Sequence, residues 1–194
     1  MSSRALRRAL CTVPVAALLA VAGCGTTPQS GADGSPSGTA SSPAATAQPR
    51  DTRIPVAKAG GTCKLLSYQK VEAALAVDFD VAAAGKGGNS CVLQVYGHEY
   101  PDLSLASSPT KADPKVFADK IAPDGAESVK GLGLAAYRVA LAAEGKAGPS
   151  AEVGWLVKGK IYVLRYTFEK GASTGQATAT APKLIALAKQ LKAS

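Results

Sequence analysis

The sequence predicts an α+β domain: an antiparallel sheet of about five strands with about three helices packed on it, stapled by one disulfide. Three observations lead to this prediction. Several segments alternate apolar and polar residues, which is the period of a half-buried strand. Three other segments carry apolar residues at helical spacing. In chain order the elements read helix, two strands, helix, three strands and helix, an order typical of helices packed on an antiparallel sheet.

The first half of the predicted domain holds one helix and two strands. Ser67 is a good N-cap residue, and a helix is predicted from it through Ala76. A strand is predicted over residues 89–96, where apolar residues alternate along the segment, and Leu103 and Leu105 mark a second strand. The apolar stripe of the helix is Tyr68, Val71 and Leu75, and the buried side of the first strand is Cys91, Leu93 and Val95.

The second half begins with a helix whose start is marked by Asp113 as cap and Pro114 in the first turn, and Pro123 ends it. Three strands follow, predicted over residues 135–141, around Val153, Trp155 and Val157, and over residues 161–168. The last two are joined by a tight hairpin at Lys158, Gly159 and Lys160. A closing helix carries Leu184, Leu187, Ala188 and Leu191 on one face, and Pro182 either starts it or lies within a longer one.

The N-terminus predicts export and a lipid anchor. A basic start is followed by an apolar stretch over residues 9–22, which as a helix covers roughly 21 Å, less than the hydrocarbon core of about 30 Å. It is therefore typical of a signal peptide, assigned to residues 1–23. The run Val21-Ala22-Gly23-Cys24 resembles a bacterial lipobox, so Cys24 is the expected lipidation site; an ordinary secretory peptide is the alternative. The expected location is the extracytoplasmic face of the cell membrane.

Residues 24–60 are predicted to be the lipidated cysteine and a disordered linker, and residues 61–194 a single globular domain. Gly, Ser, Thr, Pro and Ala dominate residues 25–50, which cannot bury a core. The formal charge of the whole chain is +8. A moderate positive charge suits anionic lipid headgroups or wall polymers, whereas the scattered basic residues and the predicted export argue against nucleic acid.

The cysteines predict one disulfide. Cys11 would leave with the signal peptide and Cys24 would carry lipid, so Cys63 and Cys91 remain and are expected to pair in an oxidising compartment. A metal site is the alternative, but two cysteines and the single His98 do not supply four ligands. No metal and no cofactor are therefore expected.

Catalytic motifs are few. His98 beside Glu99 is the one candidate general base, but neighbouring side chains of an extended segment point to opposite faces. Residues 131–136 match the letters of a dinucleotide-binding motif, but that motif needs a helix after it. A strand is predicted there instead, so the segment is interpreted as a bend into a strand. Residues 85–88 are interpreted as a glycine turn, and Asp78 and Asp80 as solvated loop carboxylates rather than a calcium site.

Surface contacts are the last candidates. Lys158 and Lys160 at the predicted hairpin tip could touch anionic lipid or wall polymer, although charged tips also keep sheets soluble. Tyr162 and Tyr166 belong to an aromatic cluster in the strand run. Packing in the sheet core explains most of that cluster, and a ligand-binding face lined by these two tyrosines is the alternative.

Several of these features together resemble an uncharacterised family of actinobacterial cell-envelope lipoproteins. They are the step Cys63-Lys64-Leu65-Leu66 before a short helix, Cys91 at the head of a strand, and the turn Gly131-Leu132-Gly133. The likeness covers about residues 61–192 with the lipobox and linker. Where an aromatic is expected soon after the second cysteine, Val92 and Leu93 stand instead. The resemblance implies a surface lipoprotein with a disulfide and transfers no catalytic residues.

From the sequence we expect a non-catalytic module of the cell envelope that binds a small apolar ligand or a protein partner. Two alternatives stay open. One is an accessory subunit of a membrane complex, and the other is an envelope hydrolase that uses His98.

Overall fold

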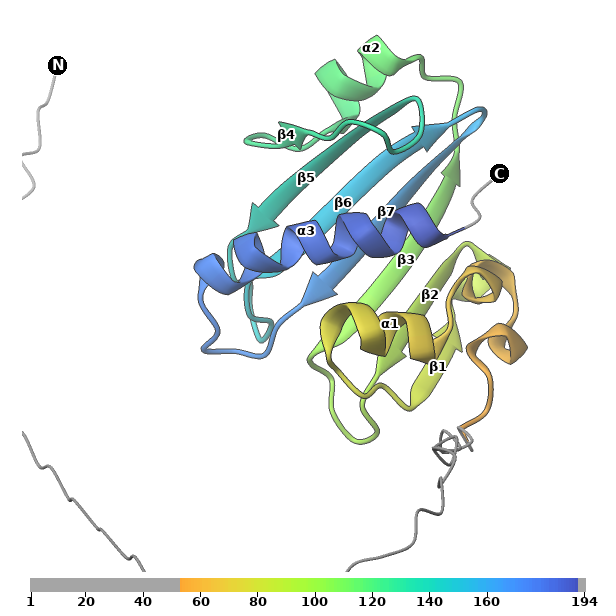
Figure 1. Cartoon of the computed structure of the whole chain (residues 1–194), viewed down its shortest axis with the longest axis vertical. Helices are drawn as coiled ribbons and strands as arrows, with labels where there is room; N and C mark the ends of the chain where they lie inside the picture. Colours follow the sequence, from red (N-terminus) through yellow and green to blue (C-terminus); the bar gives the residue numbers. More distant parts are fainter. Residues whose placement is uncertain (1–52, 192–194) are drawn as a thin grey trace, which may run out of the picture. The chain divides into compact units, whose positions relative to one another are not determined.

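The computed structural model describes residues 53–191 (Figure 1). The predicted signal peptide, Cys24 and the linker up to residue 52 lie outside this range. The three α-helices are α1 (Tyr68–Leu75), α2 (Pro114–Val116) and α3 (Thr174–Gln190). Shorter helical turns are η1 (Val56–Ala59), η2 (Gly61–Leu65), η3 (Lys86–Gly88) and the π-turn η4 (Phe117–Ile121), which continues α2.

The described residues form one seven-stranded sheet in which every neighbouring pair is antiparallel, so the predicted α+β class is confirmed. The strand order is β1-β2-β3-β7-β6-β5-β4. The strands are β1 (Val81–Ala84), β2 (Ser90–Gln94), β3 (Asp102–Pro109), β4 (Glu127–Ser128), β5 (Ala135–Leu141), β6 (Ser150–Val157) and β7 (Lys160–Thr167).

The predicted count of about five strands was too low, because it missed the two outermost strands. β1 has the sequence Val-Ala-Ala-Ala, which shows no alternation of apolar and polar residues. β4 is two residues long and pairs only with Arg138 and Tyr137 of β5. Both owe their extended conformation to a neighbouring strand rather than to their own side chains, so periodicity could not reveal them.

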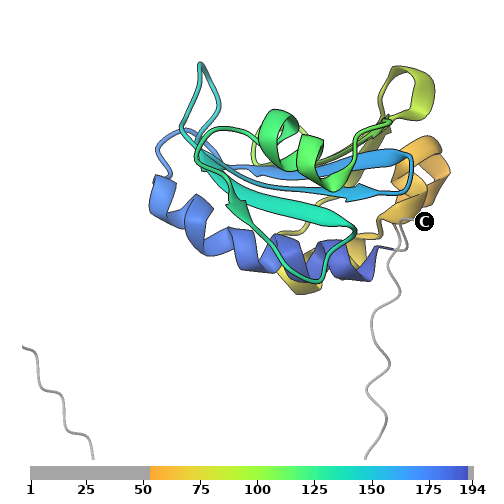
Figure 2. The same ribbon diagram turned by 90° about the horizontal axis from the view of Figure 1, so that it is seen from above.

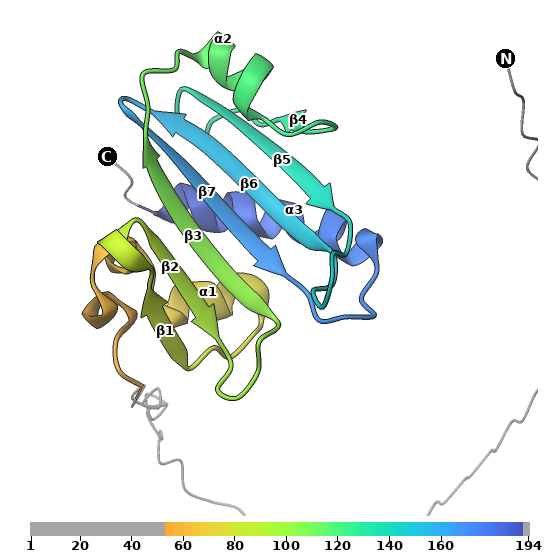
Figure 3. The ribbon, with the colours of Figure 1, turned by 180° about the vertical axis from the view of Figure 1, so that it is seen from behind.

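The sheet consists of two meanders, β1-β2-β3 and β4-β5-β6-β7, whose last strands pair with each other (Figure 3). The β3–β7 register runs from Asp102 opposite Thr167 to Pro109 opposite Lys160. A two-residue turn at Lys158 and Gly159 joins β6 to β7, as the hairpin signal predicted.

One face of the sheet is covered by α1 and α3, and the main core lies there (Figure 1, Figure 2). Leu103, Leu164 and Leu184 are fully buried in this layer. Residues 173–176 form a capping box at the start of α3, and the helix runs on through Pro182, so the longer of the two predicted forms is correct. Ser67 and Asp113 cap α1 and α2 as expected.

The opposite face, which we call the second face, is covered only at one end, by α2 and η4 (Figure 2, Figure 3). Phe117 of η4 stacks on Tyr137 with ring centroids 5.7 Å apart, and Leu156 completes this small cluster. The remainder of the second face has no helix over it in the described part of the chain, which leaves its strand side chains free to form a site.

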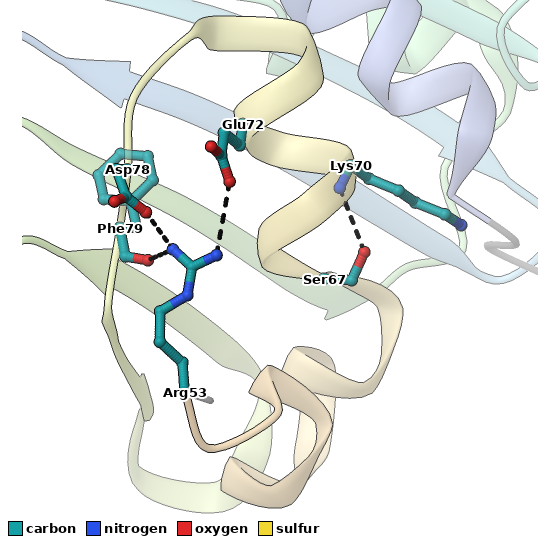
Figure 4. Close-up of polar contacts among 6 residues, drawn as sticks. All are labelled: Arg53, Ser67, Lys70, Glu72, Asp78 and Phe79. Atoms are coloured by element: carbon teal, nitrogen blue, oxygen red, sulfur yellow. Dashed lines mark hydrogen bonds and ion pairs between the residues drawn. The ribbon is translucent and has the colours of Figure 1, made fainter. Parts of the chain in front are cut away.

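The folded part begins earlier than predicted, because residues 53–60 belong to it. Val56 of η1 is 2% exposed and packs in the main core. Arg53 reaches Asp78, the carbonyl of Phe79 and Glu72, and its guanidinium lies 4.5 Å from the centre of the Tyr68 ring (Figure 4). The linker predicted to extend to residue 60 was therefore assigned too far along the chain, since composition does not show that Val56 has a pocket to fill.

The predicted disulfide is present. Cys63 of η2 is bonded to Cys91 of β2, and both residues are fully buried. The bond ties the N-terminal turns to the sheet.

Candidate functional site

Polar side chains gather on the uncovered end of the second face. Strand alternation sends Leu103 and Leu164 into the main core and therefore sends Asp102, Ser104 and Arg165 to the second face. The register continues the pattern, because Ser104 pairs with Arg165 and Arg165 pairs with Glu152 of β6. In the next row Asp102, Thr167 and Ser150 lie side by side.

Glu152 is the centre of a buried polar network. Glu152 is only 2% exposed, although it carries a carboxylate. The other residues of β6 are almost all apolar or small. The hydroxyl of Tyr137 donates to Oε1 at 2.7 Å, and Nε of Arg165 donates to Oε2 at 2.6 Å. The terminal Nη2 of Arg165 also contacts Oε2. Both oxygens of the buried carboxylate are thus satisfied, as a buried charge requires.

Gly154 makes room for this network. It lies opposite Tyr137 on β6, and a Cβ at this position would stand 2.3 Å from the tyrosine ring. The absence of a side chain lets the ring lie across β6 with its hydroxyl at Glu152. Burial, then the hydrogen bond and the negative charge of Glu152, raise the pKa of Tyr137 well above its usual range. Tyr137 therefore stays a hydrogen-bond donor at every physiological pH.

Asp102, unlike Glu152, has a carboxylate oxygen without a hydrogen-bond donor. Its Oδ1 is buried and has no hydrogen-bond partner among residues 53–191, and no other buried side-chain oxygen or nitrogen of that range shares this condition. Burial raises the pKa of the Asp102 carboxyl, and the charge of Glu99 adds to the rise. A hydrogen bond from Thr167 and the positive charge of Arg165 act in the opposite direction. An unpaired buried acceptor is uncommon in native proteins.

Asp102 and Arg165 line a cavity of about 250 Å³. Ser104, Ser150 and Thr167 add further polar groups from the sheet. Tyr100 contributes from the segment before β3, and Glu144 from the loop between β5 and β6. A larger cavity of about 390 Å³ lies between the N-terminal turns and β1, but it presents mainly apolar groups, with Lys58 and Asp80 as its charged residues. The second-face cavity is the one where several polar groups converge, and we call it the polar pocket.

The loop over residues 142–149 is held against the end of β7 by close backbone contact. The amide of Gly148 donates to the carbonyl of Phe168 at 2.9 Å, and the amide of Phe168 donates to the carbonyl of Pro149 at 3.0 Å. A Cβ at Gly148 would lie 2.1 Å from the carbonyl oxygen of Glu169, so glycine is required for this approach. The wall that carries Glu144 is therefore attached firmly to the sheet.

The tyrosines predicted as a ligand-binding face lie in the main core instead. Tyr162 is 4% exposed and stacks on Trp155 at 5.3 Å between centroids. Tyr166 is 6% exposed, meets Phe168 edge to face at 4.7 Å, and has its pKa raised by burial to about 12. That hypothesis is corrected, because the strand period turns both rings under the helices and away from the polar pocket.

Lys158 and Lys160 are exposed at the β6–β7 turn, as expected for a hairpin tip. The β3–β7 register places this turn beside Pro109. Asp102 and Thr167 lie at the other end of the same two strands. The structure therefore does not bring these lysines together with the polar pocket, and their proposed contact with anionic surfaces stays a prediction.

The other sequence candidates occupy turns. His98 is exposed in the turn between β2 and β3, and its ring makes no hydrogen bond within the described residues. Asp78 pairs with Arg53, and Oδ1 of Asp80 accepts the amide of Tyr96 at 2.7 Å. No cluster of three potential metal-ligating residues exists within residues 53–191. The segment at Gly131 and Gly133 leads into strand β5, as predicted.

Sequence reasoning missed Asp102, Tyr137 and Glu152. One signal for Glu152 was visible, since it is a lone carboxylate among the apolar residues of β6. Arg165 appears in the sequence only as one basic residue in the last predicted strand. No local pattern shows that these four side chains meet, because the meeting depends on the register between β3, β7, β6 and β5.

The fold and site define a single-sheet α+β protein with a buried charged network beside an open polar pocket. No protein-family model, no curated protein and no solved structure matches this chain. The likeness to envelope lipoproteins thus stays a prediction from the sequence. Among the helices that the structure describes, none is long and apolar enough to cross a membrane.

Proposed function

We propose that this protein is a lipid-tethered, extracytoplasmic binding module whose polar pocket holds a small polar ligand. The observation that carries the proposal is the convergence of polar side chains from the sheet and the β5–β6 loop on one open cavity, with Arg165 held in its wall by Glu152. A few polar groups that converge in a concave site are what holds and orients a small ligand.

The network behind the pocket supports the same function. Arg165 is 46% exposed at its side chain, whereas its partner Glu152 is 3% exposed, so the pair runs from the interior to the pocket wall. Such a pair contributes little net stability compared with apolar residues of the same size. It does fix the direction of the guanidinium, which is what a binding site needs from the residues behind its wall.

The tether comes from the sequence. A lipid on Cys24 followed by a Gly/Ser/Pro-rich segment would keep the domain near the membrane while the pocket samples the envelope space. The sequence prediction was a small apolar ligand or a protein partner, with a face lined by Tyr162 and Tyr166 as one possible ligand site. With those tyrosines in the core, the polar pocket favours a polar ligand instead. His98 does not line this pocket, so it is not part of the proposed site.

The experiment is a search for small ligands by protein-observed NMR on the purified, ¹⁵N-labelled protein. The panel contains amines, amides, carboxylates, polyols and sugars. We expect at least one class to shift the amide signals of Tyr100, Asp102 and Thr167 together, in a saturable way. A panel that leaves the signals around the pocket unmoved would contradict the proposed function.

A pair of matched variants makes this test specific. Ser104→Met places a long side chain in the pocket and should abolish the shifts. Ser108→Met makes the same change on the same face of β3, at an exposed position at the far end of the strand. It should leave binding intact. Equal loss in both variants would mean that the ligand binds elsewhere.

A further inference from the structure

We propose that one end of the sheet is a membrane-facing surface that lies on an anionic lipid bilayer. We call this end the lysine tip and define it by three lysines and one leucine, Lys111, Lys158, Lys160 and Leu134. The inference rests on the lipid tether of the proposed function and adds the orientation of the tethered domain. It is carried by the register of neighbouring strand ends, the unpaired charges there and an exposed leucine beside them.

Strand pairing brings Lys111 to the β6–β7 turn. Lys160 is the first residue of β7 and pairs with Pro109, the last residue of β3. Beyond that pair, the amide of Thr110 donates to the carbonyl of Gly159 at 3.0 Å. This hydrogen bond keeps the two segments side by side past the ends of the strands. Lys111 therefore lies next to a turn that already carries a lysine on each side of Gly159.

Leu134 lies on the other side of the same turn. Its amide donates to the carbonyl of Leu156 at 2.7 Å, close to the end of β6. Leu134 is 62% exposed, and no other leucine among residues 53–191 is exposed. Figure 1 shows the end of β3, the β6–β7 turn and the start of β5 at one end of the sheet, near α2. The lysine tip thus combines positive charge with an exposed apolar side chain.

The charges of the lysine tip are unpaired. Its three lysines are exposed, and none of them takes part in an ion pair among residues 53–191. Two acidic side chains of the neighbouring α2 and η4 are already engaged, because Asp113 caps α2 and Asp119 pairs with Lys115. Like charges held side by side repel one another, so an anionic partner stabilises this end of the sheet.

A lipid bilayer fits the lysine tip better than a soluble polyanion does. Each lysine near an anionic leaflet strengthens binding roughly fivefold, and a soluble polyanion would gain from the same charges. Leu134 separates the two partners. An apolar side chain beside lysines gains from the boundary between headgroups and acyl chains, whereas a hydrated polymer offers it no apolar layer.

The place where the tether enters the domain agrees with this orientation. Arg53 contacts the carbonyl of Phe79 just before β1, and the register places the start of β1 at the end of the sheet opposite the lysine tip (Figure 1, Figure 3). The chain from Cys24 to Arg53 spans at most about 100 Å, whereas the eight residues of β3 span about 26 Å. The tether can therefore reach past the sheet while the tip lies on the bilayer.

This orientation has a consequence for the polar pocket. Asp102 and Thr167 line the pocket at the end of β3 and β7 away from the lysine tip, so the pocket faces away from the bilayer. Contact through three lysines and one leucine is weak by itself. The tether makes it form because it keeps the tip at a high local concentration near the lipid.

The test is NMR of the lipidated protein in lipid nanodiscs, with its leucine methyl groups labelled. The lipid is phosphatidylcholine with or without phosphatidylglycerol, and a spin label on the headgroup of a few lipids broadens methyl signals near the bilayer. Leu134 precedes β5 at the tip, and Leu141 ends β5 beside the polar pocket. With phosphatidylglycerol we expect the relaxation enhancement of Leu134 to exceed that of Leu141 at least fivefold, and high salt should reduce this ratio.

Two triple variants separate the lysine tip from the net charge of the chain. The tip variant should bring the two enhancements to within about twofold of each other; it combines Lys111→Gln, Lys158→Gln and Lys160→Gln. The control variant removes three exposed lysines from the N-terminal turns and α1 and should keep the ratio; it combines Lys58→Gln, Lys64→Gln and Lys70→Gln. Both variants lose the same charge.

The outcomes separate this inference from the proposed function. Equal broadening of Leu134 and Leu141, stronger broadening of Leu141, or the same ratio in both triple variants would each overturn the inference. Sodium polyphosphate that shifts the Leu134 signal, while nanodiscs do not broaden it selectively, would assign the tip to a soluble polyanion instead. The mass of the purified protein shows whether it carries lipid. Without lipid, the tether and this inference fail together; with lipid and equal broadening, only this inference fails.

Discussion

The hydroxyl of Tyr137 donates a 2.7 Å hydrogen bond to Oε1 of Glu152, across the pairing of β5 with β6. The two residues are two positions out of direct register, since Tyr137 lies opposite Gly154 and Glu152 lies opposite Val139. The diagonal contact forms because Gly154 offers no side chain to block the ring. It joins the small cluster under α2 to the charged wall of the polar pocket.

Removal of the Tyr137 hydroxyl tests how much the buried network contributes to the stability of the fold. Tyr137→Phe leaves Oε1 of the buried Glu152 without a donor, so we expect the free energy of unfolding to fall by about 1–3 kcal/mol. The measurement is urea unfolding followed by circular dichroism. Tyr162→Phe is the control, because it removes the same group from a buried ring on the other side of the sheet. Equal losses in the two variants would contradict a special role for Tyr137.

The half-buried carboxyl of Asp102 should make stability depend on pH. Burial raises the pKa of Asp102 in the folded state above its ordinary value of 3.8. The unfolded chain therefore loses this proton at lower pH than the folded chain does. The contribution of Asp102 to stability is then greatest below 3.8, falls as the pH rises through the folded pKa, and stays low above it.

Asp102→Asn removes this dependence. At pH 7 we expect the variant to melt at a higher temperature than the parent, and the difference should shrink as the pH falls toward 3.8. Thermal unfolding of both proteins across this pH range measures the effect. Glu99, Glu144, Glu152 and Arg165 are the same in both proteins, so the two differ only at residue 102. A difference that does not vary with pH would contradict the prediction.

The disulfide should be a large part of the stability of the domain. Cys63 and Cys91 are 28 residues apart, and the chain-entropy relation gives about 3.5 kcal/mol for a loop of this length. We expect the double variant Cys63→Ala/Cys91→Ala to lose about that much unfolding free energy, measured by denaturant titration. A loss under about 1 kcal/mol would mean that the unfolded chain gains little freedom when the bond is absent.

Arg53 should hold the start of the folded part in place. Its guanidinium contacts Asp78, Glu72 and the carbonyl of Phe79, a fork of contacts that a lysine ammonium cannot reproduce (Figure 4). We expect Arg53→Lys to speed hydrogen exchange of the Lys58 amide in η1 by about tenfold while the amides of β6 stay protected. Unchanged exchange in η1 would show that Val56 alone secures this segment.

The anchor can be tested directly in cells. Cys24→Ser removes the thiol that would accept lipid, so labelling with a fatty-acid probe and recovery in the membrane fraction should both be lost. Cys11→Ser, within the predicted signal peptide, is the matched control and should change neither. A Cys24→Ser protein that still sediments with membranes would contradict the anchor.

The sequence alone was sufficient for features that depend on local chemistry. Ser67 and Asp113 predicted two helix starts because N-capping involves neighbours three residues away. The alternation in β2, β5 and β7 predicted strands because each segment has one buried side. The pairing of Cys63 with Cys91 followed from elimination, since the other two cysteines were assigned to the predicted signal peptide and the predicted lipid anchor.

Only the tertiary structure decided what depends on register between distant segments. The side chains of Asp102, Arg165, Glu152 and Tyr137 come from four strands, and a shift of one residue in any pairing would turn one of them into the core. The same rule placed Tyr162 and Tyr166 under the helices, although the sequence allowed them a ligand-facing role. Period-two alternation shows which residues of a strand share a face. It does not show which face the helices cover, and therefore which face is left open for a site, because the packing of the helices decides this.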